Sequence, residues 1–171
     1  MIRENFEKNM LELQNKMVEM VDLTVIAMEK SFTALQKQDM SLALDIIEED
    51  AYIDELENEI NQMAIWLMAK EQPVARDLRR IISMIKMSSD IERIADFAVN
   101  TAKATVKINK TGSILEKTSI VDMKDISMDM LKKAMHAFIE EDIALAKAVG
   151  ELDDKVDEKN QYQNSWQRYQ S

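Results

Sequence analysis

The stretch EEDAYIDELENEI, residues 48–60, places Asp50 and Asp54 four residues apart in a segment whose apolar positions follow a helical period. Side chains four residues apart lie on the same face of a helix. Asp50 falls on the apolar line itself, between Ile46 and Ile53, and Asp54 lies at its edge. A carboxylate in such a place is costly unless it is paired, protonated or bound to a cation. These positions are therefore the first place to look for function.

The same acidic ladder occurs again later in the chain. The stretch ELDDKVDEKNQ, residues 151–161, carries Asp153 and Asp157 at the same spacing of four. A shift of 103 positions aligns the two regions residue by residue, pairing Asp39 with Asp142, Leu42 with Leu145, Ala43 with Ala146, Asp50 with Asp153, Asp54 with Asp157 and Glu55 with Glu158. Similarity at a fixed offset indicates a tandem duplication of one helical module.

Apolar residues that advance by threes and fours predict three long helices in the first part of the chain. The first runs to about Leu35, and Asp39 and Ser41 then mark a turn and a new helix cap. Pro73 suits the first turn of a third helix, which continues to about Lys107. The chain is therefore expected to be all α, with antiparallel helices packed as a bundle.

A further acidic ladder lies on the third predicted helix. In SSDIERIADFAVN, residues 88–100, Glu92 and Asp96 are again four residues apart, and Glu92 replaces an apolar residue on the helical line. Ala95 and Ala98 keep its surroundings small. This ladder has no second copy in the sequence.

The composition of the chain divides it into two modules. Residues 1–108 are expected to form a first three-helix module, and residues 109–118, with Gly112 and several polar residues, form a linker. Residues 119–171 form a second module.

The second module is expected to be incomplete. The offset that relates the modules would place the counterparts of Pro73 and Glu92 beyond Ser171, so the second bundle would lack its third helix. From about Lys159 the apolar period stops, which predicts an irregular C-terminal tail. Such a remnant cannot close its own core, and we expect a homodimer or a higher homo-oligomer.

Composition excludes several classes of function. A formal charge of -10 disfavours nucleic acid and anionic membrane surfaces. The absence of cysteine excludes thiolate chemistry, and His136 is the only histidine. No glycine-rich phosphate loop is present, so an enzyme is not expected. The start lacks the apolar core of a signal peptide and no run is long enough to insert into a membrane, which predicts a soluble, cytoplasmic protein.

Three stretches together resemble the PhoU family, the regulatory proteins of bacterial phosphate uptake. They are RENFEKNMLELQNKM at residues 3–17, the DxxxDELE ladder that begins at Asp50, and DIERIADFAVNTA at residues 90–102. The resemblance covers roughly residues 2–158 and implies tandem three-helix modules. In that family, E/DxxxD motifs ligate multinuclear metal clusters, with iron or zinc, one cluster per module.

The resemblance implies specific ligands and partners. The first-module metal ligands would be the four carboxylates of its two ladders: Asp50, Asp54, Glu92 and Asp96. Asp153 and Asp157 match the second-module motif, without partners from a third helix. Proteins of this family act as adaptors between the ATPase of a phosphate ABC transporter and a sensor histidine kinase, restraining phosphate-starvation genes when phosphate is plentiful. The metal would then be structural.

Three alternatives remain open from the residues alone. The carboxylates could be a solvated helix face with Lys and Arg partners. The chain could be a metal-free helical bundle that dimerises through its apolar seams. It could also store or oxidise iron, although diiron bundles use Glu-x-x-His repeats, which His136 does not supply.

Overall fold

The computed structural model describes residues 2–108, 115 and 119–169. Throughout this described part the regular elements are helices: α1 (Ile2–Lys37), α2 (Met40–Glu71), α3 (Ala75–Lys107), α5 (Ile120–Glu140) and α6 (Ile143–Tyr169). The predicted all-α class is confirmed. The chain separates into two compact units, residues 1–114 and 115–171. The linker predicted at 109–118 lies outside the described residues except for Leu115.

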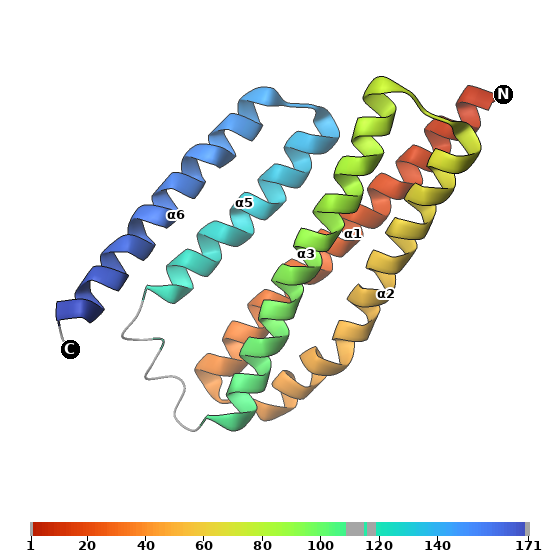
Figure 1. Ribbon diagram of the computed structural model, residues 1–171. Coiled ribbons are helices and arrows are strands. Elements are labelled where there is room, and N and C mark those ends of the chain that lie inside the picture. The colour runs from red at the N-terminus through yellow and green to blue at the C-terminus, as the bar shows by residue number, and fades with distance from the viewer. Residues whose placement is uncertain (1, 109–114, 116–118, 170–171) are drawn as a thin grey trace. The chain divides into compact units, whose positions relative to one another are not determined.

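The first unit is a three-helix bundle in which α1, α2 and α3 all pack on one another, each antiparallel to the next (Figure 1). Its core is rich in methionine, a flexible side chain that fills irregular space between helices. Fully or almost fully buried side chains come from all three helices, among them Leu13, Met17, Met20, Ile46, Ile60, Leu67, Ile81 and Met84. Each helix thus buries the apolar stripe that its sequence predicts.

The corner between α1 and α2 is held by side chains as well as by packing. Gln38 is in the left-handed region at φ 54° and ends α1. Asp39 caps α2, because its Oδ1 accepts a hydrogen bond of 3.0 Å from the backbone N–H of Leu42. The Gln38 side-chain amide donates to the carbonyl oxygens of Thr105 and Ile108, at 2.7 and 2.8 Å. The corner is therefore fastened to the end of α3, whose last carbonyls need partners.

The corner between α5 and α6 repeats this local structure. Glu141 ends α5 at φ 54°, as Gln38 ends α1. Asp142 caps α6, with its Oδ1 2.9 Å from the backbone nitrogen of Leu145. The Asp142 N–H also donates to a carbonyl five residues earlier, at 2.9 Å, as the Asp39 N–H does. The two corners are related by the offset of 103 that the sequence alignment predicts.

The end of the second unit differs from the expectation of an irregular tail. Helix α6 continues through the region after Lys159 and ends at Tyr169. This segment contains neither Gly nor Pro, and Gln, Lys and Arg are good helix formers, so its backbone stays helical although its apolar period has stopped. The prediction failed because it read a loss of periodicity as a loss of helix.

Candidate metal centre

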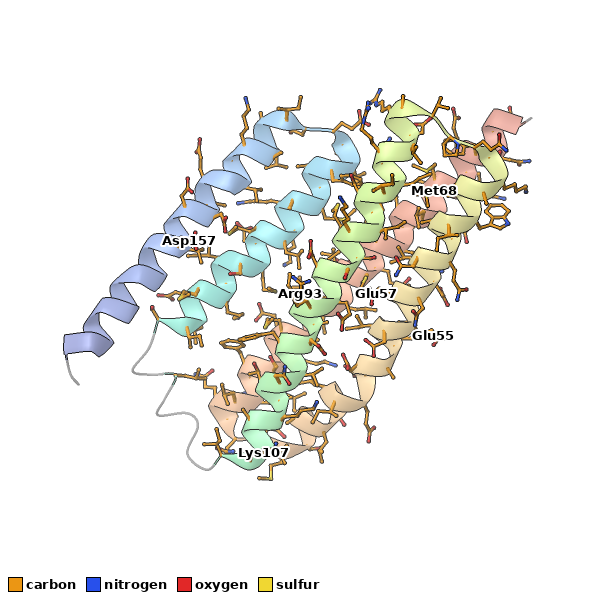
Figure 2. All side chains as sticks on the ribbon, in the orientation of Figure 1. Glu55, Glu57, Met68, Arg93, Lys107 and Asp157 are labelled. Carbon is orange, nitrogen blue, oxygen red and sulfur yellow. The ribbon has the colours of Figure 1, made fainter. Side chains whose placement is uncertain are left out.

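Three carboxylates project from one side of α2. Asp50, Asp54 and Glu57 follow one another at spacings of four and three, which keeps them on one helical face. Figure 2 shows Glu57 on the side of α2 that faces α3, and Glu55 on the opposite side. Asp50 and Glu57 are half-buried and Asp54 is exposed. The acidic face of α2 is therefore turned toward α3.

Two further carboxylates meet this face from α3. Glu92 is half-buried and Asp96 is exposed one turn later. Ala95 beside them is 1% exposed and has no side chain beyond Cβ, which allows α2 and α3 to approach closely. One turn before Glu92, the hydroxyl of Ser88 lies 3.5 Å from Oδ1 of Asn61 on α2. The Ser88–Asn61 contact joins α2 and α3 one turn away from Glu92.

The electrostatics of Glu92 show that the two faces act on one another. Burial raises the pKa of Glu92 above its ordinary value. Neighbouring negative charge raises it further, from carboxylates on both helices, in decreasing order Asp96, Glu57, Asp54 and Asp50. The pKa of Glu92 is thus raised by the charges of all four other acids. We call these five residues (Asp50, Asp54, Glu57, Glu92 and Asp96) the α2–α3 carboxylate cluster.

Two more members of the cluster are shifted in the same direction. Burial raises the pKa of Asp50, the charges of Asp54 and Asp96 add to it, and Lys103 opposes them. Burial also raises the pKa of Glu57, again with a contribution from Asp54, while a hydrogen bond from Asn61 opposes it. Like charges held close together at a half-buried site disfavour the ionised state of each.

Cations do not neutralise the cluster within the described residues. None of its five members makes an ion pair there, and Lys103 influences Asp50 without a salt bridge. Arg93, next in sequence to Glu92, instead pairs with Asp90 at 3.5 Å. In the described residues the cluster thus has no ion-pair partner, although Asp54 and Asp96 are exposed to solvent.

The carboxylate oxygens of the α2–α3 carboxylate cluster are suitable ligands for hard metal cations. Carboxylate oxygens from facing helices are the ligands that carboxylate-bridged metal sites use. In the described residues, no three His, Asp or Glu side chains are arranged to surround an ion as they stand. Binding would therefore require the cluster's side chains to turn toward one another, which the exposed Asp54 and Asp96 are free to do on their solvent side.

The second acidic pair, Asp153 and Asp157, is not part of a group of three or more possible metal ligands in the described residues. Asp153 and Asp157 are exposed on one face of α6, and Figure 2 shows Asp157 on this helix. The described part of the second unit adds no third acidic side chain in a ligating arrangement. The fold brings Asp50, Asp54, Glu92 and Asp96 close enough for their charges to affect one another. Asp153 and Asp157 gain no comparable third carboxylate in the described residues.

Glu57 was missed by reasoning from the sequence alone. The predicted ligands are acidic residues spaced four apart, whereas Glu57 stands three residues after Asp54. A helix also aligns residues three apart, so the signal was present in the same stretch.

The pH dependence of stability follows from the raised pKa values. A carboxyl whose pKa is higher in the folded than in the unfolded chain gives stability that is fully present below the unfolded pKa and is lost as pH rises through the folded pKa. In chelator, we expect the urea midpoint of Glu92→Gln to change less between about pH 5 and about pH 7 than that of the unaltered chain. Glu55→Gln, on the exposed side of α2, is the matched control. Parallel pH profiles for the unaltered chain and Glu92→Gln would contradict the expectation.

Comparison with known proteins agrees with the duplicated helical plan. The family model described as "PhoU domain" matches residues 17–105 and 120–165 of this chain. The chain belongs to the PhoU domain family. The two matched segments correspond to the bundle of α1 to α3 and to the pair α5 and α6.

Relatives in the PhoU family cover most of the chain. A "Phosphate-specific transport system accessory protein PhoU homolog" from Aquifex aeolicus is 36% identical over 151 residues, which are 88% of this chain and 68% of the relative. A protein of the same name from Clostridium acetobutylicum is 35% identical over 160 residues, covering 92% and 72%. The family resemblance predicted from the sequence is thereby confirmed.

Solved structures of PhoU proteins share the fold. The phosphate transport system regulatory protein PhoU from Streptococcus pneumoniae superposes with a TM-score of 0.80 at 26% identity, over 90% of this chain and 72% of that one. PhoU from Pseudomonas aeruginosa gives a TM-score of 0.81 at 27% identity, over 92% and 76%. None of the described helices combines the length and apolar composition needed to cross a bilayer.

Proposed function

We propose that this chain regulates phosphate uptake and phosphate-starvation signalling. The observation that carries the proposal is its similarity to phosphate-specific transport system accessory proteins over about nine tenths of its length. It would act as a helical adaptor between the ATPase of a phosphate ABC transporter and a sensor histidine kinase, without catalysing a reaction. A net charge of -10 supports protein partners over nucleic acid.

The α2–α3 carboxylate cluster would give this adaptor a metal-dependent fold. Asp50, Asp54, Glu92 and Asp96 would hold iron or zinc, with Glu57 beside them. The bound metal would supply positive charge to offset the mutual repulsion that raises the pKa values of Asp50, Glu57 and Glu92. Asp153 and Asp157 would form a second, smaller site. The proposal of a structural metal rests on the donor chemistry and on the lack of ion pairs in the described part of the cluster.

A reporter assay tests the regulatory role. In bacteria that lack their own PhoU protein, a phosphatase reporter of phosphate starvation should be active even in phosphate-rich medium. We expect the chain supplied in trans to repress it, and repression to be relieved when phosphate is withdrawn. A reporter that stays active while the chain accumulates as a folded protein would overturn the regulatory proposal.

A further inference from the structure

The groove between α1 and α2 contains an apolar pocket of about 330 Å³. Its apolar lining includes Ile26 of α1, Ile46 and Ile53 of α2, and Ala95 and Val99 of α3. Asp50 of the α2–α3 carboxylate cluster also lines it. The volume of the pocket is at the lower end of the roughly 300–1,000 Å³ found for ligand pockets, which suits one or two apolar side chains.

Two apolar or aromatic side chains that line this pocket are open to solvent, beside the charged pair Lys30 and Glu49. Ile26 is 48% exposed and Tyr52, on the facing helix, is 53% exposed. The Tyr52 hydroxyl donates a hydrogen bond of 2.9 Å to Oε1 of Glu19, which holds the ring across the groove. A pocket with exposed apolar side chains at its mouth offers an anchoring point for a side chain presented from outside.

Negative charge predominates along the groove on either side of the pocket. Lys30 pairs with Glu49 at 2.9 Å at the pocket itself. Further along, Lys16 pairs with Glu59 at 2.6 Å. The hydrogen bond to Glu59 is the main cause that raises the pKa of Lys16, and the charges of Glu12 and Glu19 raise it further.

The charges of three carboxylates (Glu12, Glu19 and Glu59) thus act on the single ammonium group of Lys16, which leaves net negative charge there. Along the groove four carboxylates (Glu12, Glu19, Glu49 and Glu59) accompany two ammonium groups (Lys16 and Lys30). The α1–α2 groove thus has an apolar pocket and acidic residues along its length. Such a surface is complementary to a helix that has an apolar stripe with basic residues on either side.

From this pocket and its border we infer that the α1–α2 groove binds a basic amphipathic helix of a partner protein. A leucine-sized or phenylalanine-sized side chain of that helix fills the pocket, and its Lys or Arg residues meet the surplus carboxylates. Charge argues against a second copy of this chain as the occupant, since both copies carry a net charge of -10. The inference does not require the role in phosphate regulation, and the peptide is tested in chelator because Asp50 belongs both to the pocket lining and to the proposed metal ligands.

A peptide of defined chemistry tests the groove in the full chain. The probe is a fluorescein-labelled helix of about 18 residues, with Leu at every third and fourth position and Lys elsewhere. Its affinity is measured by fluorescence anisotropy at about 0.15 M salt, where exposed charges more than about 8 Å apart are largely screened. We expect saturable binding, and binding about tenfold weaker for a peptide of the same composition whose Leu residues are spread around the helix.

Matched variants locate the binding site. Ile26→Ser with Tyr52→Ser removes apolar surface from the pocket mouth and should weaken binding of the probe about tenfold. Leu11→Ser with Ile65→Ser removes similar surface from the same two helices, at positions 57% and 58% exposed that do not line the pocket, and should change affinity less than twofold. Circular dichroism checks that both variants remain folded.

Three results would overturn the inference. The first is equal binding of the two peptides, and the second is equal loss of affinity in the two double variants. The third is a concentration-dependent dimer in sedimentation that the pocket-mouth variant abolishes, because a second copy would then occupy the groove. If the pocket-mouth variant does not fold, a benzophenone group at the central Leu of the peptide gives an independent answer in the unaltered chain. It should crosslink to residues 23–30 or 46–53, and crosslinks elsewhere would also refute the site.

Discussion

Zinc or ferrous iron added to the metal-free chain is expected to raise its midpoint of thermal unfolding by about 10 °C when the free metal is about a hundred times the dissociation constant. The physical reason is that the α2–α3 carboxylate cluster gathers negative charge without a salt bridge in the described residues. An ion bound only by the folded chain stabilises it by mass action and also removes the repulsion. Calorimetry or circular dichroism with and without chelator measures the effect.

Removing the predicted ligands should abolish the stabilisation by metal without lowering the stability of the metal-free chain. The combined variant Asp50→Asn, Asp54→Asn, Glu92→Gln and Asp96→Asn should gain no stability from metal and retain none after gel filtration. In chelator, the same variant should be at least as stable as the unaltered chain, because the repulsion that raises the pKa values of Asp50 and Glu92 is gone.

The control carries the same change of charge on exposed carboxylates outside the cluster: Asp22→Asn, Asp45→Asn, Glu48→Gln and Glu55→Gln. It should bind metal as the unaltered chain does. Equal metal content and equal thermal shifts in the two fourfold variants would exclude the proposed site. Oxygen consumption on adding ferrous iron would instead favour a bundle that oxidises iron.

Ile60→Ala should destabilise the first unit by about 3 kcal/mol. Ile60 lies on α2 in the same bundle as the cluster and is completely buried. Alanine leaves a cavity that a close-packed core cannot fully close, so the loss exceeds the transfer free energy of the missing carbons alone. Urea unfolding monitored by circular dichroism in chelator gives the free energy directly.

Ile65→Ala is the matched control for this substitution. It makes the same chemical change on the same helix at a side chain that is 58% exposed, and should change stability by less than about 0.5 kcal/mol. If the two variants unfolded at the same urea concentration, Ile60 would not be part of a packed core and the bundle register described here would be wrong.

The helices and their order could be predicted because the deciding signals are local. Asp39 predicts the start of α2, and apolar residues at spacings of three and four mark the buried stripes. Pro73 marks the start of α3 only approximately: the sequence predicts it in the first turn, whereas the helix begins at Ala75 with Val74 as its N-cap. The ladders Asp50/Asp54 and Glu92/Asp96 could be found for the same reason, since a helix alone places each pair on one face.

The remaining features depend on how the helices meet. No pattern within α2 shows that the charge of Glu57 raises the pKa of Glu92, because this depends on how α2 and α3 pack on each other. The groove pocket likewise is lined by residues of all three helices, such as Ile26 of α1 and Ala95 of α3, which lie far apart in the sequence. Tertiary register is a property of the packed bundle, which a period within one helix does not encode.

The duplicated corner has a consequence for how the two modules have diverged. Gln38 and Glu141 hold the same left-handed position, yet only the amide of Gln38 has N–H groups to donate to the carbonyls of Thr105 and Ile108. An ionised Glu141 can only accept. The second corner therefore has the same bend but carries a side chain that accepts hydrogen bonds where Gln38 donates them. A helix C-terminus, which offers bare carbonyls, suits the first corner, whereas the second is suited to a donor such as a lysine, an arginine or the N-terminus of a helix.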